Sequence, residues 1–358
     1  MLRPSSIFFK TLFFCASFFI FSCGNNSGSD PHLSIEEIEE LTEINLVGKW
    51  KIRRPASAFG KSASGLKNEP CNLDEIEFFE DGSYLLLVST VASGGDDKKI
   101  YRGKYGIAYT EANNEITLTR IVLMDENYNT SSTVPEVGTI ATLTELDLTS
   151  TNISFTVVFG EGTSTFCTTG TAVELSGEKS EAIAPDANED SNHAKLTKAW
   201  RLIQISATVE GTTDPNGTQQ NLCYFLEGER QDRCEDDNGN IAEDCPYTSS
   251  LTLLISEYGT YLFTFYNASG NILSEELGDW RWRETTPSYT EFEVKAPDET
   301  YSESSTVIYV RSITESTLTL REISQEEDEE GNAITLYLDY EFQLASSPYQ
   351  NTECSTND

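Results

Sequence analysis

A pattern of alternating apolar and polar residues, repeated in two halves of the chain, constrains the fold of this protein most. Val, Ile, Thr, Tyr and Phe recur in short alternating runs bounded by Gly, Asn, Asp and Ser, which is typical of strands joined by tight turns. No stretch has the spacing of βαβ units. The expected strands are 48–54, 74–80, 83–91, 99–109, 114–123, 139–148, 152–159 and 164–175 in the first half, and 199–209, 250–256, 260–267, 272–283, 290–296, 305–313, 317–323 and 333–344 in the second.

The two halves correspond to each other in order. Residues 46–50 (LVGKW) match residues 196–200 (LTKAW), and the turn at 80–84 (EDGSY) matches that at 257–261 (EYGTY). A repeat of this length indicates two domains in tandem rather than a solenoid. Eight short strands in each half predict an all-β protein of two antiparallel barrels or sandwiches.

A polar segment that contains Pro185 separates the two halves and is expected to be a linker. The predicted organisation is a signal peptide, a tether that includes a short helix, a first domain, a linker and a second domain. Their ranges are 1–22, 23–45, 46–178, 179–194 and 195–358.

The N-terminus has the features of an export signal. Arg3 and Lys10 precede an apolar stretch at 11–21 that is too short to span a bilayer as a resident helix. The stretch ends in Ser22-Cys23, with an aliphatic residue three positions before the cysteine, and this resembles the lipobox of bacterial lipoproteins. The resemblance implies cleavage before Cys23 and a diacylglyceryl group on its sulfur. An ordinary secretory signal with a chance cysteine is the alternative.

Gly24, rather than Asp, follows the cysteine, so the resemblance favours a lipid-anchored protein of the outer membrane. The chain has 59 acidic and 24 basic residues and a net charge of −35. Such a surface repels nucleic acid and anionic lipid, so membrane attachment must come from the anchor.

The Gly48-Lys49-Trp50 motif, followed by the acidic turn at 80–84 and by Gly103-Lys104-Tyr105, is similar to lipocalin-like domains of Gram-negative envelope lipoproteins. This resemblance covers both halves and implies two eight-stranded barrels. It also implies that Trp50, and Trp200 in the second copy, pack at one end of a barrel. The second copy departs from the pattern, since Lys198 replaces the glycine.

Six cysteines remain after Cys15 in the signal and Cys23 at the anchor, and an even number in an exported chain predicts disulfides. The first domain contains only Cys71 and Cys167, which are expected to pair. The order of the repeat then predicts Cys245–Cys354 and leaves Cys223–Cys234. Four cysteines allow three connectivities, so the sequence alone does not decide the disulfide pairing of the second domain.

The sequence indicates no catalytic chemistry. The two histidines, His32 and His193, are expected in the tether and linker, and no Cys-x-x-Cys pair exists. We therefore predict no catalytic residues, no metal, no cofactor and no enzyme activity. In the acidic loop at 235–244, some oxygen-bearing residues and a glycine have the spacing found in calcium-binding loops. The first and twelfth positions of such a loop lack carboxylates, so a plain turn is favoured.

Aromatic residues of the second half suggest a pocket. Tyr261, Phe263 and Phe265 share one face of a strand, and Trp280 and Trp282 share a face of another. These five are the candidate residues for binding a small apolar or glycan ligand, and a packed barrel core is the alternative. The predicted function is a non-catalytic, lipid-anchored binding protein; the alternative is a structural subunit of an envelope complex with a protein partner.

Replacing the lipobox cysteine tests the predicted anchor. Two or three acyl chains hold a protein on a membrane, whereas an unmodified N-terminus does not. We expect Cys23→Ala to move the exported protein from the membrane fraction to the soluble fraction, as followed by immunoblotting. Cys15→Ala is the matched control and should leave the protein on the membrane. A Cys23→Ala protein that still partitions with membranes would contradict the assignment.

Overall fold

A computed structural model describes most of the chain between residues 42 and 345. The described residues are 42, 44–53, 71–89, 98–112, 115–125, 138–164, 166–184, 187–210, 222–235, 245–283, 289–297, 299–302, 305–327 and 333–345. The predicted signal peptide, Cys23, His32, Cys354, nearly all of the acidic loop and most of the helix expected in the tether lie outside them; residues 42 and 44–46 are described and are helical.

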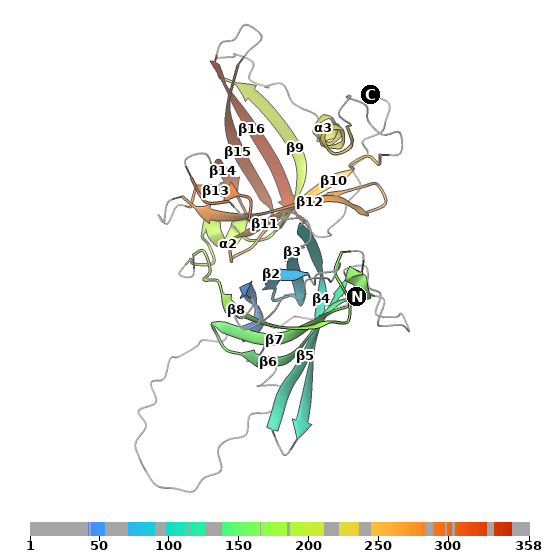
Figure 1. Ribbon diagram of the computed structural model, residues 1–358. Helices are drawn as coiled ribbons and strands as arrows, with labels where there is room; N and C mark the ends of the chain where they lie inside the picture. Colours follow the sequence, from blue (N-terminus) through green and yellow to red (C-terminus); the bar gives the residue numbers. More distant parts are fainter. Residues whose placement is uncertain are drawn as a thin grey trace, which may run out of the picture.

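The first half forms a closed barrel of eight antiparallel strands (Figure 1). Consecutive strands pair with each other, and β1 also pairs with β8, which closes the sheet. The strands are β1 (Gly48–Arg53), β2 (Asn72–Phe78), β3 (Ser83–Ser89), β4 (Lys98–Ala112), β5 (Glu115–Asp125), β6 (Thr139–Leu148), β7 (Asn152–Phe159) and β8 (Ala172–Lys179).

The second half forms a second closed barrel with the same topology. Its first strand, β9, pairs with both β10 and β16. The strands are β9 (Ala199–Val209), β10 (Ser250–Ile255), β11 (Thr260–Tyr266), β12 (Ile272–Trp282), β13 (Glu291–Lys295), β14 (Thr306–Ile313), β15 (Thr317–Glu327) and β16 (Ala333–Leu344). The prediction of an all-β chain with two eight-stranded barrels is confirmed.

The strand expected at 164–175 is wrong in its first part. A short 3₁₀ turn, η3 (Glu161–Thr163), follows β7; no described residue between 164 and 171 is in a strand, and β8 begins only at Ala172. At Gly160 a Cβ atom would lie 2.3 Å from the carbonyl oxygen of Thr139, so a glycine is needed where the chain passes β6 and turns. Cys167 lies between this turn and β8 and is bonded to Cys71, as predicted.

The two tryptophans of the repeated motif occupy equivalent positions. Both are fully buried, and each indole nitrogen donates a hydrogen bond to the carbonyl oxygen four residues earlier. The distances are 2.8 Å from Trp50 to Leu46 and 2.9 Å from Trp200 to Leu196. The shared hydrogen bond fixes how the chain enters the first strand of each barrel, so both tryptophans are structural.

A buried cluster of charges joins the two barrels. Lys49 of β1 is 3% exposed, and its Nζ lies 2.9 Å from Glu75 of β2 and 2.8 Å from Asp279 of β12. Asp279 also binds Lys295 of β13 at 2.6 Å. Burial alone would lower the pKa of Lys49, but the charges of Glu75 and Asp279 outweigh it and hold this pKa above its ordinary value.

Two further polar contacts belong to the same interface. Arg102 of β4 donates to the Thr264 hydroxyl at 3.0 Å and to the Tyr266 hydroxyl at 2.9 Å, both on β11. Glu77 of β2 is fully buried opposite Ser256 and Thr260, and burial raises its pKa, although both hydroxyls and Lys49 act in the opposite direction. The interface therefore buries several ionisable groups.

The interface also explains why the two copies of the tryptophan motif differ. Gly48 has φ +132°, and a Cβ atom there would lie 2.5 Å from Lys179 and 3.2 Å from the Tyr258 ring of the second barrel. A glycine is therefore required where the first copy meets the second barrel. The corresponding Lys198 instead forms an ion pair with Glu315 at 2.6 Å.

The charge cluster makes Lys49 important for stability. Lys49→Met removes the cation between Glu75 and Asp279, and we expect it to lower the free energy of unfolding by on the order of 2 kcal/mol. The value lies below that of a fully buried pair because both carboxylates retain some contact with water. Lys51→Met, two residues along the same strand and exposed, is the control. Urea unfolding measures the free energy of unfolding of both variants. An equal loss of stability in Lys49→Met and Lys51→Met would refute the importance of the cluster.

Candidate ligand-binding site

The second barrel contains a cavity of about 480 Å³. Its wall is formed by strands from the whole circumference of the barrel and by one helix. The apolar lining residues are Leu202, Phe225, Leu251, Leu253, Ile255, Tyr261, Phe263, Phe265, Leu277, Phe292, Val294, Ala296, Ile308, Leu320, Tyr340 and Phe342. An eight-stranded barrel has room inside either for its own side chains or for one small ligand, and here some of that room is left unfilled.

The period of two along β11 decides which side chains line the cavity. Tyr261, Phe263 and Phe265 face inward and belong to the lining. Thr264 and Tyr266 face outward, where Arg102 of the first barrel binds them. Both faces of β11 are therefore covered, one by the cavity wall and the other by the neighbouring barrel. The structure thus places three of the five predicted ligand-binding residues at the cavity.

The other two predicted residues lie outside the lining. Trp280 and Trp282 pack edge to face at 5.3 Å and are buried together with Phe292, which does line the cavity. The indole nitrogen of Trp282 donates to His193 Nδ1 at 3.1 Å. Both tryptophans belong to a packed cluster behind the cavity wall. The alternative interpretation of these two residues, that they are part of the barrel core, is therefore correct.

His193 is part of this cluster rather than of an exposed linker. It lies in the short helix α2 (Asn192–Leu196), whose first turn is capped by the Ser191 hydroxyl. The side chain is 4% exposed, and burial lowers its pKa to about 4. The expectation that residues 179–194 form a simple polar linker is therefore wrong at this position, because the imidazole fills a gap among aromatic rings.

A helix completes the wall of the second barrel where two strands diverge. β10 pairs with β9 only at residues 199–201, whereas β9 continues to Val209 along β16. Helix α3 (Leu222–Cys234) packs against β9 beside this divergence (Figure 1). Its Phe225 lines the cavity and contacts the Tyr340 ring at 6.3 Å, and Leu226 is buried in the barrel core.

This helix was not predicted, although its sequence contains a signal for it. Leu222, Phe225 and Leu226 have the spacing of one helical face, and Glu229 and Arg233 are spaced for an ion pair on the helix. Its position between two strands of an all-β domain could not be predicted, because only the divergence of β9 from β10 creates a place for it.

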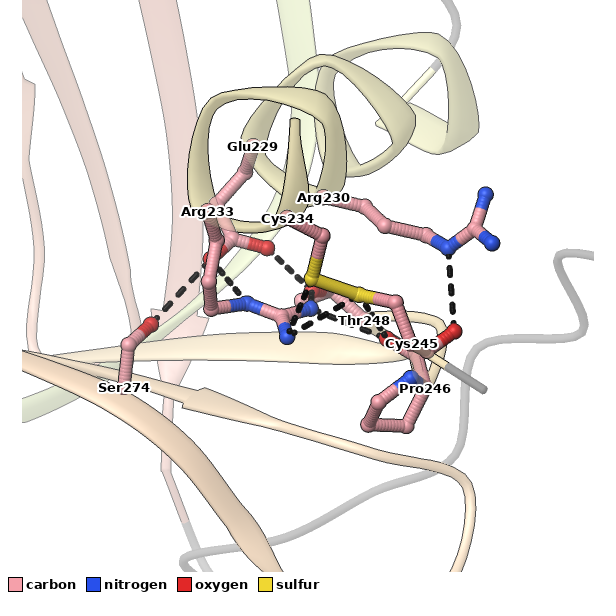
Figure 2. Close-up of polar contacts among 8 residues, drawn as sticks. All are labelled: Glu229, Arg230, Arg233, Cys234, Cys245, Pro246, Thr248 and Ser274. Atoms are coloured by element: carbon pink, nitrogen blue, oxygen red, sulfur yellow. Dashed lines mark hydrogen bonds and ion pairs between the residues drawn. A yellow bond between two sulfur atoms is a disulfide. The ribbon is translucent and has the colours of Figure 1, made fainter. Parts of the chain in front are cut away.

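The C-terminal end of α3 is tied to the barrel by a covalent bond and a polar network, shown in Figure 2. Cys234, the last residue of the helix, is bonded to Cys245, which precedes β10. Arg230 Nε donates to the Cys245 carbonyl oxygen at 3.2 Å, and Arg233 donates to that of Pro246 at 2.9 Å. Because these bonds hold the last turn of α3, the helix is a fixed part of the cavity wall.

Glu229 is the central acceptor of this network. It forms an ion pair with Arg233 at 3.1 Å and accepts a hydrogen bond from Ser274 of β12 at 3.1 Å and another from Thr248 (Figure 2). One carboxylate thus connects the helix to two parts of the second barrel.

The Cys234–Cys245 bond contradicts both disulfides predicted for the second domain, Cys245–Cys354 and Cys223–Cys234. Cys223 and Cys234 lie eleven positions apart on one helix, about 16 Å along its axis, which exceeds the reach of a disulfide. Cys223 is also disulfide-bonded, and Cys354 lies outside the described residues. The order of the repeat misled the prediction because α3 has no equivalent among the described residues of the first barrel.

Charged groups also line the cavity. Glu276 of β12, Glu299 and Glu322 of β15 belong to the lining, together with the base Lys295. Lys295 is held by Asp279, so its charge is compensated. Glu322 accepts a hydrogen bond from the Tyr340 hydroxyl at 3.2 Å, and burial raises the pKa of Glu276.

The described residues contain no group of three or more His, Cys, Asp or Glu side chains placed to hold a metal ion. In the same part of the chain, no helix is long and apolar enough to cross a membrane.

The sequence matches no protein-family model and no curated protein. Among solved structures it is similar to a deswapped triple mutant of bovine odorant binding protein, with 16% identity over 43% of this chain and 76% of that one and a TM-score of 0.20. It is also similar to a mutant of transferrin binding protein B from Haemophilus parasuis Hp5, with 9% identity over 83% of this chain and 58% of that one and a TM-score of 0.19. These likenesses concern the fold alone.

The buried imidazole predicts a pH dependence of stability. Unfolded histidine takes up a proton near pH 6.5, whereas folded His193 does so only near pH 4, so its contribution is complete above pH 6.5 and is lost as the pH falls toward 4. We expect the free energy of unfolding of the wild type to fall by about 2 kcal/mol more over this interval than that of His193→Asn. Denaturant unfolding at several pH values measures the difference, which isolates His193 from the many carboxylates. Parallel pH profiles would contradict the assignment.

Proposed function

We propose that this protein is a lipid-anchored, non-catalytic binding protein of the bacterial cell envelope, which holds a small, mainly apolar ligand inside its second barrel. The observation that supports this function is the cavity of about 480 Å³, because ligand sites are typically concave, mostly apolar and of this order of size. The lipobox at Cys23 supports the anchor and the envelope location.

The chemistry of the wall favours an apolar ligand over a glycan. Aliphatic and aromatic side chains make up most of the lining, and burying them against a ligand is worth about 25 cal/mol per Å² of apolar area. A glycan would need many hydrogen-bond partners, whereas the polar side chains of the lining are few: Glu276, Lys295, Glu299, Ser305, Thr306 and Glu322, besides the Tyr261 and Tyr340 hydroxyls.

The first barrel has a different role in this proposal. Its interior contains a cluster of large buried side chains that includes Trp50, Phe78, Phe155 and Phe159. Its surface supplies Lys49 and Arg102 to the second barrel. We infer that it is a packed support between the lipid anchor and the binding barrel.

A structural or interaction role is the second candidate, and an open groove favours it. The groove, of about 690 Å³, is lined by Ile44, Val47, Ile107, Tyr258 and further residues of the first barrel. Ile44, at the edge of this groove, is 62% exposed and so is accessible to a partner. Co-purification of an envelope protein from mild detergent, lost on Ile44→Asp, would favour this candidate over ligand binding.

A fluorescent apolar probe tests the binding function. N-phenyl-1-naphthylamine should bind with saturation and gain fluorescence. We expect Leu253→Trp and Ile308→Trp, which fill the cavity from different strands, each to weaken binding at least tenfold, about 1.4 kcal/mol.

The matched control is Ile323→Trp. Ile323 is 39% exposed on β15 and does not line the cavity, so its replacement should leave binding unchanged. Circular dichroism verifies that each variant is folded. Absence of saturable binding to the wild type, or equal binding by the folded cavity variants, would refute the proposed function.

A further inference from the structure

The cavity of the second barrel combines aromatic rings with carboxylates, and this combination indicates the charge of its ligand. The inference rests on the proposed function, since it concerns the same cavity. Of the side chains in its lining that carry a charge near neutral pH, three are acids, Glu276, Glu299 and Glu322, and one is a base, Lys295. Asp279 forms an ion pair with Lys295 at 2.6 Å and so neutralises its charge. The cavity wall therefore presents a net negative charge to a ligand.

The strand register brings one carboxylate and two rings together. Glu276 of β12 is paired directly with Phe263 of β11, and directly opposed residues on one face of a sheet have side chains in contact range. The Tyr261 and Phe263 rings lie 5.8 Å apart, edge to face. The Tyr261 ring lies over Gly278, where a Cβ atom would come within 2.4 Å of its hydroxyl, so the ring needs a glycine beneath it.

The electrostatics of the same group support this placement. Burial raises the pKa of Tyr261 to about 12, and the charges of Glu276, Asp279 and Glu299 act in the same direction. On the lining of another strand, Glu322 is fixed by the Tyr340 hydroxyl and can accept further hydrogen bonds. A carboxylate beside aromatic faces is the arrangement that recognises ammonium groups, because the faces of the rings also attract a cation.

We propose that the ligand is a cationic amphiphile, with an apolar body in the cavity and an ammonium-type head between Glu276 and the rings of Tyr261 and Phe263. An anionic amphiphile such as a fatty acid is disfavoured, because its carboxylate would meet Glu276 and Glu322 without a free base to neutralise it. The negative surface of the whole chain acts in the same direction, since it attracts cations toward the barrel.

Competition with the bound naphthylamine probe tests the charge preference. The competitors are decyltrimethylammonium, 1-decanol and decanoate, which share one chain and differ in charge, each below its micelle concentration. We expect the ammonium compound to displace the probe at a concentration at least tenfold lower than decanol, and decanoate to be weakest. Glu276→Gln should reduce the preference for ammonium over decanol at least fivefold.

The matched control is Glu210→Gln, which makes the same change of charge at an exposed position after β9 that does not line the cavity. It should retain the full preference, which separates local recognition from the general attraction of an acidic protein. If decanol and decanoate bind as well as the ammonium compound, or if Glu276→Gln leaves the preference intact, the charge inference fails while the binding function stands. If the probe itself does not bind, both fail.

Discussion

Closure of each sheet is the constraint on which the rest of this structure depends. Eight antiparallel strands that close on themselves leave no free edge, and they enclose a space only slightly wider than the side chains that point into it. The first barrel fills this space with large aromatic and aliphatic residues. The second closes with β10 and β9 paired over only three residues, and α3 occupies the position beside the divergence. Phe225 of this helix forms part of the cavity wall.

Charged and polar side chains link the two barrels. Two lysines and two carboxylates alternate in a chain of ion pairs at the interface, in the order Glu75, Lys49, Asp279 and Lys295. Glu77 is also buried at this interface. Buried charges are costly unless each has partners, so such a cluster specifies one relative placement of the barrels more than it adds stability. This placement also covers the outer face of β11, whose inner face lines the cavity.

The strands were predictable because their signal is local. Alternation over five to ten residues located nearly all of them, and both tryptophans of the repeat have the structural role that the sequence suggested. The prediction failed at η3 and α3, which have no counterpart among the described elements of the other copy, and at α2, whose counterpart is the helical turn at 44–46. The disulfides show the same difference between local and tertiary information. Cys71–Cys167 was predictable because the first domain contains only these two cysteines, whereas Cys234–Cys245 depends on where α3 lies.

The sequence by itself determined the all-β class, the division into two barrels and the shared face of Tyr261, Phe263 and Phe265. Only the tertiary structure decided that Trp280 and Trp282 belong to a packed cluster with His193, and that Glu276 lies among aromatic rings of the cavity. The physical reason is that the pattern of a strand is a local property, whereas the surroundings of a side chain are not. Periodicity reports which face of a strand a residue occupies, but whether that face meets a side chain or open space depends on strands and helices distant in the chain.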